Sequence, residues 1–204
     1  MESYSLDTYV KFLGMIAHPE GGFYLETYRS DATISRDLGP TFPVGATRSL
    51  LTSIHYALRA GQKSALHKIS SDELWAWHAG GPLVVVELAP GGVVIETIVG
   101  CDVKLGHKLT HVVPAGRWFG SYVPCDVKPG FSLVSCIVAP GFDFADWQMS
   151  DAGAIRDELC KTADPTYATS ATSTAMLDSV LSYLAQGASQ PLPRCLPPGF
   201  IHAT

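Results

Sequence analysis

The sequence predicts an all-β fold, an antiparallel sandwich or barrel, for three reasons. About eight or nine short segments rich in β-branched and aromatic residues follow one another at near-regular spacing. Gly and Pro residues lie between these segments, as they do in the turns that connect antiparallel strands. No helical pattern separates consecutive segments, which disfavours a parallel α/β sheet. A small β-barrel can hold one small ligand in its interior.

The elements can be placed along the chain in order. A short amphipathic helix is expected within residues 5–14, where apolar side chains recur at helical spacing and Gly14 can end the helix. Residues 31–46 contain the polar, Gly and Pro residues of a loop. The expected strands are 23–30, 47–58, two within 61–80, 83–88, 92–99, 109–113, 117–123 and 131–139.

After residue 142 the pattern changes from strand to helix. Ser150 and Asp151 can cap a helix that runs to about Cys160, and a second helix is expected over 175–185, ended by Gly187. A Pro-rich segment follows. The chain of 204 residues is therefore expected to form one barrel domain over 1–150, with the N-terminal helix and strand included. Residues 151–204 would be a helical and Pro-rich extension packed on the same domain.

The composition excludes several classes of function. The formal net charge is −5 and there is no run of Lys or Arg, so we expect no binding to nucleic acid or to a membrane surface. No apolar run reaches the roughly 18 residues of a membrane span, and the N-terminus lacks a secretory pattern. Five cysteines without a CxxC pair indicate reduced thiols in a cytoplasmic protein and argue against a zinc site.

Residues 61–80 carry the strongest functional signal. His67 lies on one expected strand, and Glu73, Trp75 and Trp77 share one face of the next. If these faces look the same way, an imidazole, a carboxylate and two indoles line one concave wall. Ionisable groups among bulky apolar ones are usually paired or functional. The candidate catalytic residues are therefore His67 and Glu73.

Other polar residues are open to two interpretations. His18 and Glu20 precede two glycines, and a turn with hydrogen-bonding side chains is favoured over a catalytic role. Cys136 lies in the middle of a strand, where an inert buried thiol is favoured over a nucleophile. Arg29 and Arg48 could hold an anionic group or make a structural ion pair.

The spacing within 61–80 resembles the first signature of the cupin superfamily, whose members are jelly-roll barrels. Gly61, His67, Glu73 and Gly80 match that signature, whereas Ile69 replaces its second histidine. The second signature is matched by Pro114-Ala115-Gly116, but Phe119 stands at its histidine position and Val123 at its asparagine position.

The chain also resembles one cupin branch catalogued as a domain of unknown function. Four blocks occur in the order of that branch and span roughly residues 10–147; they are His18–Gly22, His67–Trp75, Val113–Phe119 and Cys136–Phe144. The resemblance implies a homodimer, with exchange of an edge segment around residues 17–29. Sheet edges that need cover give this expectation a physical reason.

In metal cupins three histidines and one glutamate hold the ion, and this chain keeps only His67 and Glu73. Two protein ligands hold an ion incompletely, so we predict no metal and no other cofactor. A divalent metal at His67 and Glu73 would need help from His18, His55 or His78, and His78 has the wrong strand parity.

Three functions follow from the resemblance and the residues. The leading hypothesis is a metal-independent isomerase or epimerase for a small carbohydrate-like or keto substrate, with His67 as base and Glu73 as its orienting partner. The alternatives are a binding module without turnover and a metal-dependent dioxygenase or decarboxylase. His67 and Glu73 could also be a purely structural buried pair. The expected ligand-binding residues are Trp75, Trp77, Trp118, Phe119, Tyr56 and Arg48.

Overall fold

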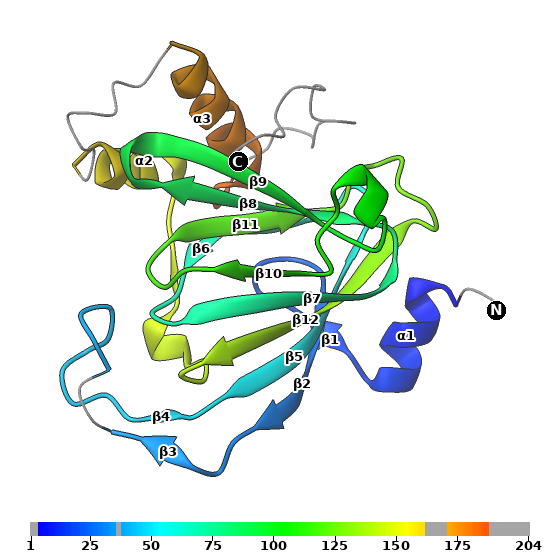
Figure 1. The fold of residues 1–204 in the computed structure, drawn as a ribbon, viewed down its shortest axis with the longest axis horizontal. Helices are drawn as coiled ribbons and strands as arrows, with labels where there is room; N and C mark the ends of the chain where they lie inside the picture. Colours follow the sequence, from blue (N-terminus) through cyan, green and yellow to red (C-terminus); the bar gives the residue numbers. More distant parts are fainter. Residues whose placement is uncertain (1–3, 36–37, 162–170, 188–204) are drawn as a thin grey trace.

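The structure is a computed structural model that describes residues 4–35, 38–161 and 171–187, and it consists mainly of two antiparallel sheets (Figure 1). The larger sheet contains, in spatial order, β1 (Ile16–Ala17), β2 (Phe23–Arg29), β5 (Thr52–Arg59), β12 (Phe131–Ala139), β7 (Asp72–Gly80) and β10 (Thr110–Val113). The smaller sheet contains β13 (Gln148–Met149), β6 (Lys63–Lys68), β11 (Trp118–Tyr122), β8 (Leu83–Ala89) and β9 (Val93–Val99). A separate two-stranded ladder pairs β3 (Thr33–Ile34) with β4 (Arg48–Ser49).

The strands from β5 to β12 have the connectivity of a jelly roll. Their order is β5-β12-β7-β10 in one sheet and β6-β11-β8-β9 in the other, so the chain passes from sheet to sheet at each connection except the β8–β9 hairpin. The first and last of these strands, β5 and β12, pair with each other. The expected all-β jelly-roll class is confirmed.

The N-terminal helix α1 (Leu6–Leu13) forms where the apolar spacing predicted it. The Ser5 hydroxyl accepts a hydrogen bond from the backbone N–H of Thr8, and Gly14 ends the helix in the left-handed conformation. The buried side chain of Leu6 belongs to a small core with Leu133 on β12. Helix α1 therefore covers part of the outer face of the larger sheet.

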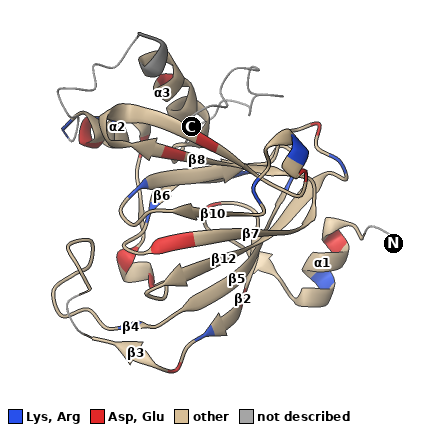
Figure 2. Ribbon diagram, in the orientation of Figure 1, with Lys and Arg blue, Asp and Glu red and all other residues tan. Residues whose placement is uncertain are grey.

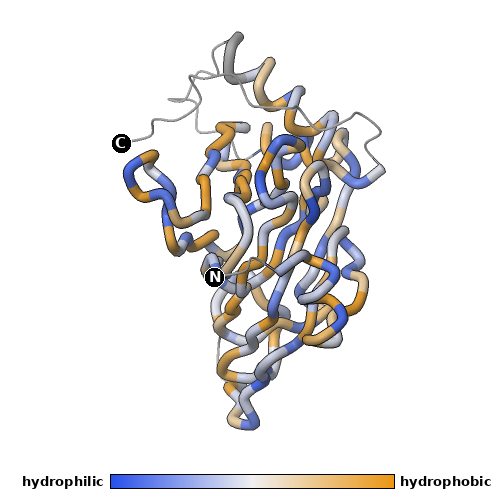
Figure 3. The backbone as a smooth tube through the Cα atoms, turned by 90° about the vertical axis from the view of Figure 1, so that its right-hand side faces the viewer, coloured by the Kyte–Doolittle hydropathy of each residue, from blue (hydrophilic) through white to orange (hydrophobic). Residues whose placement is uncertain are grey.

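The side chains of the smaller sheet alternate between two cores, one on each face. On β11, Trp118 belongs to the outer core and Phe119 to the inner one, between the sheets. On β6, Leu66 joins the outer core and His67 points to the inner side. Figure 3 shows hydrophobic and hydrophilic residues interspersed along the backbone. Both faces of this sheet are thus buried.

Two C-terminal helices form the cover over the outer core. They are α2 (Ala152–Lys161) and α3 (Ala171–Leu184), and their buried side chains include Ile155 and Leu181. The N–H of Ala154 donates to the Asp151 carboxylate, so the predicted cap is confirmed. Helix α3 begins four residues before the expected start at 175. The Pro-rich segment lies outside the described residues.

Three short strands occur in segments without a strand pattern, namely β1, β3 and β13, and three short 3-10 helices lie at Pro90–Gly92, Val103–Leu105 and Phe144–Asp146. Each of the short strands has two residues, too few for a period to be recognised. Figure 2 shows basic and acidic residues scattered along the ribbon, without a continuous basic stretch. In the described ranges, no helix combines the length and apolar character that crossing a bilayer requires.

Candidate active site

A cavity of about 300 Å³ lies between the two sheets. Its walls come from β2, β5, β6, β7 and β12, from the turn before β2 and from the segment after β12. The lining residues are His18, Glu20, Tyr24, Glu26, Arg29, Thr52, Ile54, Tyr56, His67, Ile69, Glu73, Trp75, Cys136, Val138, Phe142, Asp143 and Phe144. The volume lies at the small end of the range for ligand pockets, which starts at about 300 Å³.

His67 is buried on β6, and its neighbours fix which ring nitrogen carries the proton. Nδ1 lies 2.9 Å from the carbonyl oxygen of Ala65 and 3.4 Å from Oε2 of Glu20. Both partners can only accept, so Nδ1 is the protonated nitrogen. In the neutral ring Nε2 then carries the lone pair. The ring packs against Phe119, with 4.1 Å between centroids, which holds its plane.

Glu20 is the carboxylate that organises this part of the cavity. Its Oε2 accepts from the hydroxyl of Ser64 at 2.8 Å, and its Oε1 accepts from Nε1 of Trp147 at 2.6 Å. The side chain is only 8% exposed. Because donors from two separate segments hold this carboxylate, it is a fixed partner for the N–H of His67.

A tight turn before β2 brings Glu20 into the barrel. The backbone N–H of Gly21 donates to the carbonyl of His18, and the carbonyl of Glu20 accepts from the N–H of Ala65 on β6. Gly21 and Gly22 both have positive φ, and a Cβ on Gly21 would lie 2.2 Å from the carbonyl oxygen of Lys63. Gly21 is therefore required for the turn to approach β6, and Gly22, whose Cβ would lie 2.5 Å from the carbonyl oxygen of Ala57, for it to approach β5.

His18 also lines the cavity, and its two ring nitrogens have the opposite roles to those of His67. The backbone N–H of Glu20 donates to Nδ1 of His18 at 3.3 Å, so Nδ1 is an acceptor and Nε2 carries the proton in the neutral ring. Burial lowers the pKa of His18, opposed by Glu20 and assisted by His67. The ring also packs edge-on against Tyr24 and Tyr56. His18 is thus a neutral hydrogen-bond donor at pH 7.

Glu73 is held in its protonated form. Burial raises its pKa to about 8, with a further increase from Glu20 and an opposing hydrogen bond with the Cys136 thiol. Burial also raises the pKa of Cys136 well above its ordinary value, so this thiol is not a thiolate nucleophile. At neutral pH the cavity therefore contains a carboxylic acid that can donate a hydrogen bond.

The structure corrects the expected His67–Glu73 dyad. Both residues line the cavity as predicted, but the carboxylate that contacts the His67 ring is Glu20, and the described residues show no ion pair between His67 and Glu73. The turn proposed for His18 and Glu20 exists, and the same two side chains also line the cavity. The orienting role assigned to Glu73 belongs by geometry to Glu20.

The aromatic wall is smaller than predicted. Trp75 and Tyr56 line the cavity, and the Tyr56 hydroxyl donates to the carbonyl of Gly21 at 2.7 Å. Trp118 lies in the outer core under the C-terminal helices, because its neighbour on the strand faces inward. The expectation that Trp118 lines the cavity is wrong.

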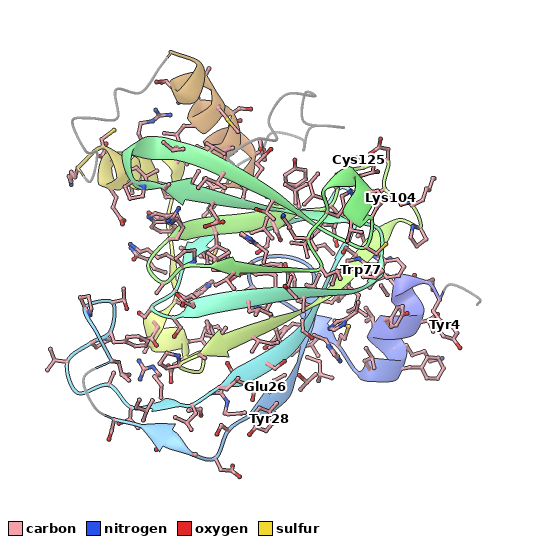
Figure 4. All side chains as sticks on the ribbon, viewed as in Figure 1. Tyr4, Glu26, Tyr28, Trp77, Lys104 and Cys125 are labelled. Atoms are coloured by element: carbon pink, nitrogen blue, oxygen red, sulfur yellow. The ribbon has the colours of Figure 1, made fainter. Side chains whose placement is uncertain are left out.

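The other expected ligand-binding residues also lie behind or beside the cavity wall. Phe119 is buried behind His67, and Trp77 donates from Nε1 to the carbonyl of Gly81 towards the far end of β7 (Figure 4). Arg48 makes a two-point ion pair with Asp146, with both distances 2.6 Å. Of its two interpretations, the structural ion pair is the one observed.

The mouth of the cavity contains Arg29, for which the ion pair is the interpretation observed, and three residues to which the sequence analysis gave no specific role in a site. Glu26 on β2, labelled in Figure 4, pairs with Arg29 three residues later, and both side chains are 43% exposed. Asp143 and Phe144, which follow β12, complete this rim. In the sequence, these residues were indicated only by the alternating strand pattern over 23–30 and by the cupin-like block Cys136–Phe144.

The residues do not fit the metal site of a metal cupin. Ile69 and Phe119 supply no ligand, and Nδ1 of His67 is occupied by Ala65. His55 and His78 lie on the opposite face of the larger sheet, where both contact Ser135. Among the residues that the structure describes, no group of three or more His, Cys, Asp or Glu could hold an ion. We derive no chemistry through a metal.

Comparison with known proteins places this geometry in a family. The model of the family described as "Cupin superfamily (DUF985)" matches residues 7–150. The uncharacterized protein YML079W of Saccharomyces cerevisiae is 32% identical over 149 residues, which are 70% of this chain and 73% of the yeast protein.

Two solved structures are similar over most of the chain. A hypothetical protein from Leishmania major superposes with a TM-score of 0.73 at 29% identity, covering 89% of this chain and 99% of that one. A protein from Shewanella oneidensis gives a TM-score of 0.63 at 32% identity, covering 81% and 99%. With its four sequence blocks, its jelly-roll order and a family match over residues 7–150, the chain belongs to the cupin superfamily, in the family described as DUF985.

Proposed function

We propose that this cupin is a metal-independent isomerase or epimerase for a small carbohydrate-like or keto substrate. The observation that supports it best is the proton arrangement of the cavity. Nδ1 of His67 is fixed as a donor to Ala65 and Glu20, which leaves Nε2 as a base, and Glu73, which lines the same cavity, is a neutral acid. A base and an acid in one closed cavity are what proton transfer next to a carbonyl requires.

The proposed reaction begins with removal of a proton. Nε2 of His67 takes the proton from the carbon next to the substrate carbonyl, and the electron pair of that C–H bond moves onto the carbonyl oxygen. The carboxylic acid of Glu73 or the Nε2–H of His18 stabilises this oxygen by donating a hydrogen bond. For an epimer, the Glu73 carboxylic acid delivers its proton to the other face of the same carbon, His67 releases the abstracted proton to solvent, and Glu73 takes up a proton from solvent. For an isomer, the former carbonyl oxygen takes the proton of Glu73, the hydroxyl on the deprotonated carbon passes its proton to the Glu73 carboxylate as a new carbonyl forms there, and protonated His67 returns the abstracted proton to the former carbonyl carbon.

Glu20 acts through His67 in this scheme. When His67 takes up the proton, its ring becomes positively charged, and the carboxylate 3.4 Å from Nδ1 stabilises that charge. Ser64 and Trp147 keep the carboxylate in place. Glu20 is therefore a positioning residue rather than a group that contacts the substrate in this scheme.

The experiment is solvent exchange. Free ketoses, beginning with dihydroxyacetone and D-xylulose, are incubated with the protein in D₂O, and deuterium at the carbon next to the carbonyl is followed by NMR. His67→Asn should lower the exchange rate by roughly 10² to 10⁴, the usual contribution of a general base. His55→Asn, on the opposite face of the sheet, is the matched control and should exchange normally. Binding without exchange would instead favour the ligand-binding module.

The homodimer stays a prediction. Strand β1 pairs with β2 only at Phe23 and Tyr24, and the β2 side chains from Glu26 onward are exposed. This free edge is where we expect a second copy to add its own strands. Sedimentation of the protein at micromolar concentration tests it, and a monomer there would contradict the expectation. The cytoplasmic location likewise stays a prediction.

A further inference from the structure

The charges around the cavity do not favour an anionic ligand. We propose that the cavity selects an uncharged, hydroxyl-rich carbonyl compound and rejects its phosphorylated or carboxylated forms. This inference rests on the proposed function, of which it specifies the substrate class. It is carried by the distribution of acidic and basic side chains from the inner end of the cavity to its mouth.

At the inner end, the described lining residues are the acidic Glu20 and Glu73 and the imidazoles of His18 and His67, without a Lys or Arg. Glu20 accepts from the hydroxyl of Ser64 and the indole N–H of Trp147 and lies 3.4 Å from Nδ1 of His67. Glu73 is a neutral acid at pH 7, and His18 is a neutral ring. An anion in this space would lie near the carboxylate of Glu20 in a region that excludes most water, where repulsion between like charges is strong.

The mouth contains Arg29, and among the described residues that line the cavity no other Lys or Arg occurs. Its guanidinium is already engaged. Nε and Nη2 donate to the two carboxylate oxygens of Glu26 at 3.0 and 2.7 Å, and Nη1 donates to the carbonyl of Phe142 at 3.1 Å. Asp143 lies close enough to raise the pKa of Arg29 further. Two carboxylates therefore neutralise the one cation that could have bound a phosphate.

The remaining wall suits a neutral ligand of modest size. The space of about 300 Å³ is small for a nucleotide-linked sugar, and Trp75 and Tyr56 give the wall apolar ring surface against which the C–H groups of a sugar can pack. Hydroxyl groups can donate to Nε2 of His67 and accept from His18 and Glu73. The ring faces bind apolar surface and the polar groups set orientation, as is usual in small-molecule sites.

The test compares ligands that differ only in charge. Saturation-transfer NMR measures the binding of dihydroxyacetone, D-xylulose and D-fructose and, for comparison, of the phosphate ester of each sugar. Each measurement is made at low salt (about 20 mM NaCl) and at high salt (about 300 mM NaCl). We expect each ester to bind at least about tenfold more weakly than its parent sugar at low salt, with a smaller ratio at high salt. The double variant Glu26→Gln, Asp143→Asn frees Arg29 and should strengthen binding of the esters. Adding Arg29→Gln should abolish that gain.

The outcomes separate this inference from the proposed function. Tighter binding of an ester than of its parent sugar, or failure of all three neutral sugars to bind, overturns the inference. Solvent exchange on a preferred phosphate ester would overturn it while supporting the isomerase. Selective binding of neutral sugars without exchange would support the inference and reject the isomerase. A double variant that leaves the ester affinity unchanged would show that the carboxylates of the mouth do not set the selectivity.

Discussion

Replacing Glu73 by glutamine should change how the stability of the protein depends on pH. The carboxyl is 7% exposed, and burial together with Glu20 raises its pKa from 4.5 to about 8. The folded state thus holds a proton that the unfolded chain releases between these values. Stability from this group is fully present below about pH 4.5 and is lost as pH rises through about 8. Glutamine keeps the shape and cannot ionise.

The size of the effect follows from the same pKa. One pKa unit corresponds to about 1.4 kcal/mol, so a change of about 3.5 units costs at most about 5 kcal/mol above pH 8. Between pH 6 and pH 8 the loss should be about 2 kcal/mol, because the slope flattens near the folded pKa. A domain is stabilised by only about 5–15 kcal/mol in total, so this is a large fraction.

The assay is urea unfolding of the wild type and Glu73→Gln at pH 6, 7, 8 and 9. The difference between their free energies of unfolding should shift by about 2 kcal/mol in favour of the variant from pH 6 to pH 8. Glu26→Gln, at the exposed mouth, controls for the removal of a charge and should show no such shift. Parallel pH profiles for the wild type and Glu73→Gln would refute the assignment of a neutral carboxylic acid in the cavity.

Three further changes test the framework of the barrel. Gly22→Ala should lower stability by about 2 kcal/mol or more, because its φ of +74° is strained for alanine and the new Cβ would lie 2.5 Å from a β5 carbonyl. Gly45 has a similar φ of +76° but open space around it, so Gly45→Ala is the control. If Gly45→Ala lowers the melting temperature as much as Gly22→Ala does, the clash with β5 does not explain the loss. Asp146→Ala leaves the half-buried Arg48 without its partner and should cost roughly 1–3 kcal/mol in urea unfolding; a loss below about 0.5 kcal/mol would contradict this. Burial raises the pKa of Glu96 to about 7, so the stability that this group contributes should fall as pH rises from 4.5 through 7. Glu96→Gln should therefore make the melting temperature depend less on pH over that range, and an unchanged pH dependence would contradict the raised pKa.

The sequence predicted the position of a side chain correctly where alternation along a single strand determines it. His67 and Glu73 lie on the expected strands and line one cavity, because alternation along a strand fixes which side chains share a face. Alternation does not tell which face is inside when both are covered. Trp118 and Phe119 are neighbours on β11, and each is buried in a different core. The helices that cover the outer face removed the contrast that would have distinguished them.

The carboxylate partner of His67 depends on contacts between distant segments. The residues around Glu20 have the composition of a turn, and no local pattern states where a turn docks. Its position is set by the hydrogen bond from Ala65, by the Trp147 indole after the last long strand and by the close approach that Gly21 allows. For the same reason the ion pair of Arg48 could not be predicted, because its partner Asp146 is 98 residues away. Pairings of this kind appear only in the folded chain.

The pairing of β5 with β12 determines when the cavity can exist. Residues 80 positions apart, such as His55 and Ser135, face each other across this ladder, so the barrel cannot close until the ribosome has released almost all of its strands. Contacts at such long range form slowly, and the nascent sheets expose apolar surface in the meantime. The cavity is therefore an all-or-none property of the finished barrel, and a fragment that stops before β12 would lack one of its walls.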